Sequence, residues 1–316
     1  MLNQILCLIA ALFLSEAADV YVDKGYPYRQ GPLKVQQIPV TKTGNGSPLD
    51  SIIIHPVDPG TYAIFFFVPG LNGVILSSFY TDYLTGVAQH GFITISTDLL
   101  INDEYGAQTK DEGFHFGDLY MNQIRWLQKN LAIVLNANSA SGVVGTWDLL
   151  GLGSHSAGAD ATLYIAAKYP SLPKALALMG PYTTSFRTAV NFSMPILLVQ
   201  TEYATHHKGL MPPCMTDKFG YKHIWDLWPR PPRVRMEVKG FGHCGICNQA
   251  LWQSCYKYQV CVTTQNVTSL PAYHTFTQGL TAAFFSTYLA GYDANLKYVI
   301  NQTLVTEPLL ELIADV

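Results

Sequence analysis

WDLLGLGSHSAGAD is the sequence at residues 147–160. Its apolar start predicts a buried strand, the small residues around Ser156 predict a sharp turn, and the segment that follows predicts a helix. Such a unit exposes a serine hydroxyl above a sheet, and it needs small neighbours because strand and helix nearly touch. The pattern is Ser154-x-Ser156-x-Gly158, with serine at the first position where glycine is usual. Ser156 is therefore the candidate nucleophile.

Strand and helix patterns alternate through the middle of the chain. Strands are expected at residues 36–40, 51–55, 62–68, 92–97, 148–151, 175–179, 196–200 and 234–238, and helices at residues 78–90, 119–131, 159–169 and 275–289. The unbroken apolar run at residues 62–68 is typical of a strand buried on both faces. We expect an α/β fold of the α/β-hydrolase type, with a mostly parallel central sheet flanked by helices on both faces.

Length and charge narrow the class of protein. The chain has 316 residues, a net charge of −3 and only 13% charged residues. This length fits one large α/β domain, which we expect over residues 18–316 with its core at about residues 30–292. The low charge argues against a nucleic-acid surface. The oligomeric state has no signal in the sequence.

The N-terminus predicts export. Residues 5–14 are apolar, and residues 15–17 are of the kind that a signal peptidase reads, so we expect a signal peptide at residues 1–17. The alternative, a membrane anchor, is disfavoured because ten apolar residues cannot span a bilayer. The mature chain is thus expected to be secreted, without a transmembrane segment. Glycosylation is expected at four Asn-x-Ser/Thr sites, at Asn45, Asn191, Asn266 and Asn301.

Cysteine usage agrees with an oxidising compartment. The cysteines that would remain after cleavage all lie in the C-terminal third: Cys214, Cys244, Cys247, Cys255 and Cys261. They indicate two disulfides and one leftover thiol, and the spacing leaves the pairing open. The alternative is a zinc site built from Cys244, Cys247 and one of the last two cysteines. That use is less common in a secreted chain, so we expect no metal.

Acyl transfer needs a base and oxyanion donors beside the nucleophile. His243 follows the last predicted parallel strand, which is where the base of such a fold lies. The amides of Ala157, after the nucleophile, and Leu71, after the strand at residues 62–68, are the candidate donors. The acid is open between Glu202, which follows the strand at residues 196–200, and Asp217.

Several stretches together resemble the chlorophyllase family of serine α/β-hydrolases. They are residues 67–72 with the oxyanion loop, residues 152–158 with the elbow, residues 240–243 with the histidine, and residues 277–289 with the final helix. The resemblance implies the catalytic pair Ser156 and His243. It also places the family's Asp-Pro step on Gly180-Pro181, where the carboxylate is missing.

The resemblance implies a function. A secreted carboxylic-ester hydrolase would act on an apolar ester, such as chlorophyll cleaved to chlorophyllide and phytol, and would need no metal or organic cofactor. A general lipase or cutinase-type esterase is one alternative. A binding or adhesion protein that has lost catalysis is another, and the missing carboxylate at Gly180 motivates it. The aromatic segments at residues 80–83 and 225–228 are candidates either for an apolar pocket or for the core.

Overall fold

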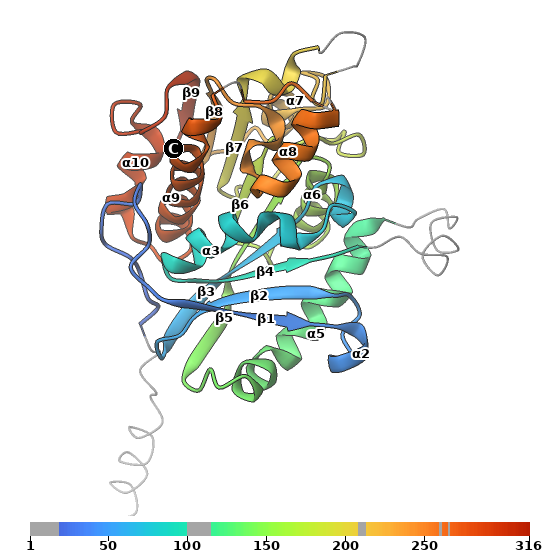
Figure 1. Ribbon diagram of the computed structural model, residues 1–316, viewed down its shortest axis with the longest axis vertical. Coiled ribbons are helices and arrows are strands. Elements are labelled where there is room, and N and C mark those ends of the chain that lie inside the picture. Colours follow the sequence, from blue (N-terminus) through green and yellow to red (C-terminus); the bar gives the residue numbers. More distant parts are fainter. Residues whose placement is uncertain (1–18, 100–114, 208–212, 259–260, 265) are drawn as a thin grey trace, which may run out of the picture.

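A computed structural model describes residues 19–99, 115–207, 213–258, 261–264 and 266–316 of the chain. The predicted signal peptide lies outside the described residues. Within them, one sheet has the strand order β1-β2-β4-β3-β5-β6-β7-β8-β9 (Figure 1). Its strands are β1 (Val35–Val40), β2 (Ser51–Pro56), β3 (Gly60–Val68), β4 (Phe92–Thr97), β5 (Val143–His155), β6 (Ala175–Met179), β7 (Ile196–Thr201), β8 (Arg233–Val238) and β9 (Leu309–Asp315).

The sheet is mostly parallel, as expected. The six strands from β4 to β8 in the sheet order run parallel to one another, whereas β1, β2 and β9 join the two ends in antiparallel pairing. The helices are α2 (Lys42–Asn45), α3 (Thr81–Gln89), α5 (Phe116–Ala137), α6 (Gly158–Lys168), α7 (Tyr221–Leu227), α8 (Gln249–Tyr258), α9 (Leu270–Tyr288) and α10 (Leu296–Ile300). The expected α/β class is therefore confirmed.

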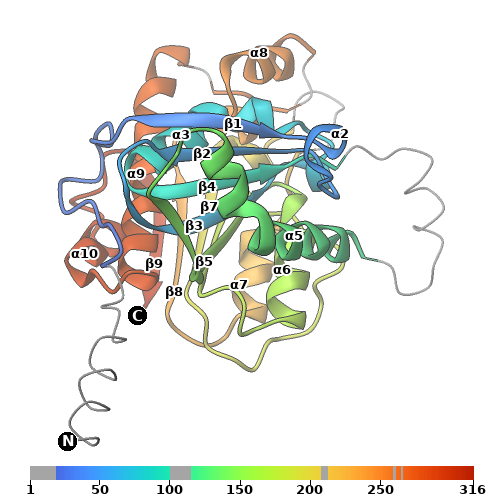
Figure 2. The same ribbon diagram turned by 90° about the horizontal axis from the view of Figure 1, so that it is seen from below.

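Helices cover both faces of the sheet and bury a separate core on each (Figures 1 and 2). Strand β3 shows why, since Ile64 and Phe66 belong to one core while Phe65 and Phe67 belong to the other. Side chains from α5, α6 and α7 complete the first core, and side chains from α3, α9 and α10 complete the second. Alternate residues of a strand point to opposite faces, so an unbroken apolar run is what a doubly covered strand requires.

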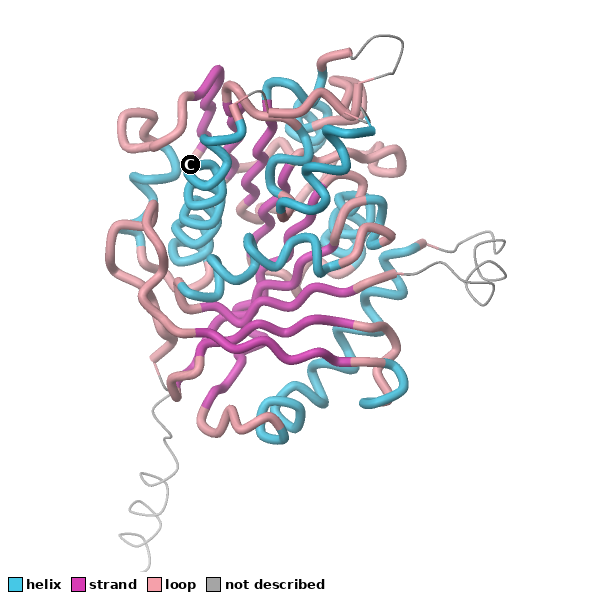
Figure 3. The backbone as a smooth tube through the Cα atoms, viewed as in Figure 1, coloured by secondary structure: helices cyan, strands magenta, loops and turns pink. Residues whose placement is uncertain are grey.

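Several elements differ from the sequence prediction: β5 is longer than expected, and β9 and the helices α2, α7, α8 and α10 were not predicted. Strand β9 lies beyond the expected core, at the sheet edge beside β8 (Figure 3), and its alternating, half-exposed residues gave too weak an apolar signal. Helix α8 was not predicted, because its sequence is more polar and contains Cys255. Trp225 and Trp228 belong to the core under α7 rather than to a pocket.

The order of the strands brings distant residues together. Parallel strands end at one edge, so the residues that follow β3, β5, β6 and β8 meet there. Gly70 follows β3, Ser156 follows β5, Gly180 follows β6 and His243 follows β8. None of the helices in the described part of the chain is long and apolar enough to cross a membrane.

Candidate active site

Ser156 sits in a strained turn between β5 and α6. Its φ is 55°, in the left-handed region that a residue with a side chain rarely adopts. The turn is held because the Ser156 amide donates to the Met179 carbonyl (3.1 Å), while the Ser156 carbonyl accepts from Tyr182 (3.0 Å). The surrounding sheet thus imposes the backbone conformation that presents the serine side chain.

The elbow also depends on Gly158. A β-carbon added there would lie 2.5 Å from the Pro69 carbonyl oxygen and 2.6 Å from that of Val68. The start of α6 therefore packs directly on the backbone at the end of β3. Ser154, at the position where glycine is usual, is fully buried and its hydroxyl has no partner.

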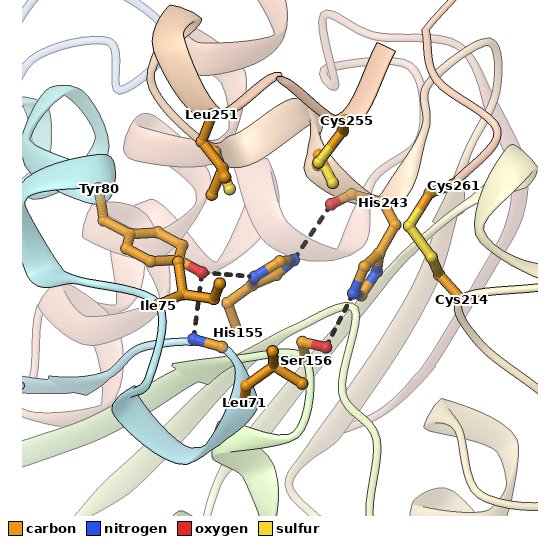
Figure 4. Close-up of a pocket in the computed structure, with 13 residues that line it drawn as sticks. Leu71, Ile75, Tyr80, His155, Ser156, Cys214, His243, Leu251, Cys255 and Cys261 are labelled. Atoms are coloured by element: carbon orange, nitrogen blue, oxygen red, sulfur yellow. Dashed lines mark hydrogen bonds between the residues drawn. A yellow bond between two sulfur atoms is a disulfide. The ribbon is translucent and has the colours of Figure 1, made fainter. Parts of the chain in front are cut away.

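His243 lies within hydrogen-bond distance of Ser156, although 87 residues separate them (Figure 4). The distance from His243 Nε2 to Ser156 Oγ is 2.9 Å. His243 opens a 3₁₀ turn, His243–Ile246, that follows β8, and its side chain is only 7% exposed. Burial, and to a lesser extent the neighbouring His155, holds the pKa of His243 well below its usual range. The imidazole is therefore neutral at pH 7 and able to accept a proton.

The structure does not bring the predicted acid to His243. Glu202 accepts instead from the Gly240 amide, with 2.7 Å between Oε2 and N, and so stabilises the loop before His243. Asp217 is exposed and pairs with Lys222 at 3.5 Å. Nδ1 of His243 is buried and has no hydrogen-bond partner in the described part of the chain. The assignment of Glu202 as the acid is corrected on this geometry.

Gly180 occupies the place from which a carboxylate would reach the imidazole. A β-carbon added to Gly180 would lie 2.9 Å from His243 Nδ1. The position inferred from the sequence resemblance is thus next to the histidine in space, but the residue has no side chain. The site holds a serine–histidine pair, and no carboxylate is hydrogen-bonded to the histidine among the described residues.

The two predicted oxyanion donors come from different segments of the chain. Ala157 precedes the first residue of α6, and Leu71 lies in a tight loop after β3 in which Leu71 and Asn72 both have positive φ. In the described part of the chain, neither amide donates a hydrogen bond. Both remain available to a developing oxyanion.

A series of hydrogen bonds that was not predicted from the sequence links the segments that carry Gly70, His155 and His243 (Figure 4). The Gly70 amide donates to the Tyr80 hydroxyl (3.1 Å), which lies 2.9 Å from His155 Nδ1. His155 Nε2 donates to the carbonyl oxygen of His243 (3.1 Å). A carbonyl only accepts, so the proton of the neutral ring is on Nε2 and the tyrosine donates to Nδ1. Burial lowers the pKa of His155 to about 4, which keeps it neutral.

A cavity of about 200 Å³ opens at Ser156 and His243. Its walls are mostly apolar or sulfur-containing side chains, among them Leu71, Ile75, Tyr80 and Leu251 (Figure 4). Tyr80 is the member of the predicted aromatic segments that reaches this cavity. An apolar lining of this kind favours a hydrocarbon group next to the reacting bond.

The cysteines gather around the same cavity. Cys214 and Cys261 form a disulfide, with 5.6 Å between their Cα atoms, whereas Cys244, Cys247 and Cys255 are buried free thiols. Among the described cysteines there is thus one disulfide where two were expected. Burial raises the pKa of the Cys247 thiol, and hydrogen bonding to Cys255 is the main cause that raises the pKa of Cys244. The disulfide removes Cys261 from the alternative zinc site.

The four predicted glycosylation sites lie on the surface. Asn45, Asn191, Asn266 and Asn301 are all exposed. In two of them the asparagine Oδ1 accepts from the amide of the threonine two residues later, at 3.2 Å from Asn266 and 3.0 Å from Asn301. No described helix or strand would have to open to expose these side chains.

Comparison with known proteins agrees with the family resemblance that the sequence motifs indicated. The family model described as chlorophyllase matches residues 24–180 and 174–313. Chlorophyllase-1 of Arabidopsis thaliana is similar as well, with 21% identity over 306 residues that cover 89% of this chain and 90% of the relative.

Proposed function

We propose that this chain, which belongs to the chlorophyllase family, hydrolyses carboxylic esters with Ser156 as its nucleophile and His243 as its base. The family resemblance predicted from sequence motifs is confirmed by the match over most of the chain. Family membership suggests an ester hydrolase. The serine mechanism, the substrate and the compartment are the further steps of the proposal.

One contact carries the proposed mechanism, the 2.9 Å hydrogen bond from Ser156 Oγ to His243 Nε2. A serine hydroxyl is a weak nucleophile until a base takes its proton, so the two atoms must be within hydrogen-bond reach. Here a neutral, buried imidazole meets a serine in a strained turn at the bottom of an apolar cavity. Decay of an active site would not be expected to preserve all these features together.

The proposed reaction has two steps. Ser156 Oγ attacks the ester carbonyl carbon while His243 Nε2 takes its proton, and the amides of Leu71 and Ala157 donate to the oxyanion. The imidazolium then protonates the leaving alcohol, which leaves an acyl-enzyme. A water molecule, deprotonated by His243, attacks the acyl carbon and releases the acid and Ser156.

The cavity supports an ester with an apolar chain. A volume of about 200 Å³ is below the range of a typical small-molecule site, so it would hold a short chain or one part of a long one. The name of the relative, Chlorophyllase-1, suggests chlorophyll as the substrate. We propose hydrolysis of chlorophyll to chlorophyllide and phytol, with the bulk of the substrate outside the cavity.

Two substrates test this proposal. Purified protein is assayed with p-nitrophenyl butyrate and with chlorophyll a, beside Ser156→Ala and His243→Ala. Both variants should lose at least 99% of the activity, since each removes a member of the proton-transfer pair. Cleavage of the short ester but not of chlorophyll would retain the esterase and reject the specific substrate. Equal activity of wild type and Ser156→Ala on both esters would reject the mechanism.

We also propose that the protein is secreted and glycosylated. The apolar N-terminal run, the exposed asparagines and the Cys214–Cys261 disulfide support this proposal. When the chain is expressed in a eukaryotic secretory host, the protein should appear in the culture medium, and its first residue should be Ala18. Peptide N-glycosidase should increase its electrophoretic mobility. Retention inside the cells with the N-terminus intact would count against secretion.

A second candidate function rests on Gly180. Without a carboxylate beside His243, the scaffold could bind an ester without cleaving it. A fluorophosphonate probe separates the two candidates, because it reacts covalently only with an activated serine. Labelling that disappears in Ser156→Ala favours the enzyme, whereas an unlabelled wild type favours the binding protein.

A further inference from the structure

Two buried polar atoms that have no hydrogen-bond partner among the described residues lie beside Gly180. One is Nδ1 of His243 and the other is Oε1 of Gln200, whose side chain is 1% exposed. A β-carbon on Gly180 would be 2.9 Å from the first atom and 3.7 Å from the second. Both atoms therefore border the space that a β-carbon of residue 180 would enter.

The backbone holds this space in place. Gly180 follows β6 and Gln200 lies near the end of β7, which pairs with β6 in parallel. The Gly180 amide donates to the carbonyl of Val199, the residue before Gln200. The φ of Gly180 is 50°, in the left-handed region that glycine adopts most readily.

The two atoms are chemically complementary. When Nε2 of His243 accepts from Ser156, the neutral ring carries its proton on Nδ1, which is then a donor. Gln200 Oε1 is an acceptor. A buried polar group left without a partner destabilises a protein, so two such atoms beside one glycine indicate a shared partner.

We propose that Gln200 is the residue that positions His243, through one water molecule held in the space beside Gly180. The water accepts from His243 Nδ1 and donates to Gln200 Oε1, each at about 2.8 Å. It holds the tautomer in which Nε2 is free to take the Ser156 proton. This inference rests on the proposed function and names the element that takes the place of the missing carboxylate.

A neutral amide orients the imidazole as a carboxylate does, but it stabilises the imidazolium less. His155 packs on the His243 ring, and the other titratable groups that line the cavity beside it are Tyr80 and the thiols of Cys244, Cys247 and Cys255. No carboxylate of the described residues is hydrogen-bonded to the ring. A weaker base with a correct tautomer is the expected result.

The experiment uses the full mature protein and a fluorophosphonate probe, which reports on Ser156 without a choice of substrate. Gln200→Leu keeps the bulk and removes the acceptor, so labelling should slow at least tenfold. Gln200→Glu restores an acceptor with a charge, so labelling should recover and its acid midpoint should move to higher pH. Gly180→Ala fills the space and should slow labelling as Gln200→Leu does.

Thr201→Val is the matched control. Thr201 is the next residue of β7, it is buried, and its Oγ1 also has no partner, but it points to the opposite face of the strand. Its labelling rate should equal that of wild type. Thermal melting of each variant identifies any loss of folding, and Gln200→Glu remains informative if Gln200→Leu is unstable.

Nitrogen-15 NMR of histidine-labelled protein supplies a readout other than activity. The wild type should show His243 with its proton on Nδ1, and Gln200→Leu should show a mixture of tautomers. Labelling of Gln200→Leu at the wild-type rate and midpoint, with Ser156→Ala unlabelled, would overturn this inference and retain the proposed function. An unlabelled wild type would overturn both.

Discussion

The imidazole of His155 packs against the imidazole of His243, with 4.5 Å between the ring centroids and 30° between the ring planes. The same ring donates from Nε2 to the carbonyl oxygen of His243. His155, the residue before Ser156, thus holds both the side chain and the backbone of His243. The serine turn and the histidine loop are therefore coupled through one buried ring.

His155→Phe should reduce kcat/KM on p-nitrophenyl butyrate by about fivefold, since one hydrogen bond that positions His243 contributes on the order of 1 kcal/mol. The phenyl ring keeps the packing and loses both polar contacts. Tyr80→Phe, which breaks the contacts with Gly70 and His155, should give a smaller decrease. Wild-type kinetics in both variants would contradict a role for the hydrogen bonds that link Gly70, Tyr80, His155 and His243.

The rate should remain high at mildly acidic pH. Burial holds the pKa of His243 well below 6.5, so the neutral base persists as pH falls through the usual range of histidine. We expect the acid midpoint of fluorophosphonate labelling to lie below pH 6.5. The measurement is the pseudo-first-order rate from pH 4 to 8, and a midpoint above 6.5 would contradict the buried, unpaired environment of the ring.

The stability of the folded protein should decrease as the pH falls from about 6.5 to about 4. The folded protein binds no proton at His155 until about pH 4, whereas the unfolded chain binds one below about pH 6.5. The unfolded state therefore gains protons first, and the free energy of unfolding should fall by up to about 1.4 kcal/mol per pH unit for this residue. Urea titrations at pH 7, 6 and 5 measure the slope. In His155→Phe the free energy of unfolding should depend less steeply on pH. A slope identical to that of the wild type would contradict the lowered pKa of His155.

Two substitutions in the nucleophile turn should have opposite outcomes. Gly158→Ala forces a β-carbon against the backbone of Val68 and Pro69. We therefore expect the free energy of unfolding to fall by about 1–3 kcal/mol, and the fluorophosphonate probe to label Ser156 more slowly. Ser154→Ala removes a buried hydroxyl without a partner and should be neutral or slightly stabilising. The urea midpoints of the two variants are compared with that of the wild type. An equal decrease in both variants would contradict the difference expected between Gly158 and Ser154.

The disulfide should contribute strongly to stability. Cys214 and Cys261 are 47 residues apart, and closing a loop of that size stabilises a fold by about 4 kcal/mol in the chain-entropy model. Cys214→Ser should therefore lower the urea midpoint markedly, and the double variant with Cys261→Ser should be no worse. A midpoint equal to that of wild type would show that the bond does not constrain the unfolded chain.

The parallel core could be predicted because its signal is local. Strands β4 and β6 have the predicted bounds, since each is a short apolar run. Strand β9 was missed because an edge strand buries one face only, and its pairing with β8 includes the ion pair of Arg235 with Glu311. Part of β5 was missed too, where polar residues and Gly145 precede the apolar run.

The residues of the candidate site also fall into those that the sequence could predict and those that it could not. Ser156 and His243 follow from their positions after strands, which the sequence reveals. Gln200 and Tyr80 act through contacts between distant segments, and the signal for Gln200 was only a polar residue at the end of an apolar run. Glu202 was the nearest carboxylate along the chain, but its side chain turns toward the Gly240 amide.

The bare backbone at position 180 also has a genetic consequence. Every glycine codon becomes a codon for aspartate or glutamate when its second base changes from G to A. Aspartate tolerates a left-handed φ better than most residues, although its β-carbon would press on the imidazole. A lineage carrying this gene is thus one nucleotide away from an acidic residue beside His243, and the imidazole would have to shift to make room for its β-carbon.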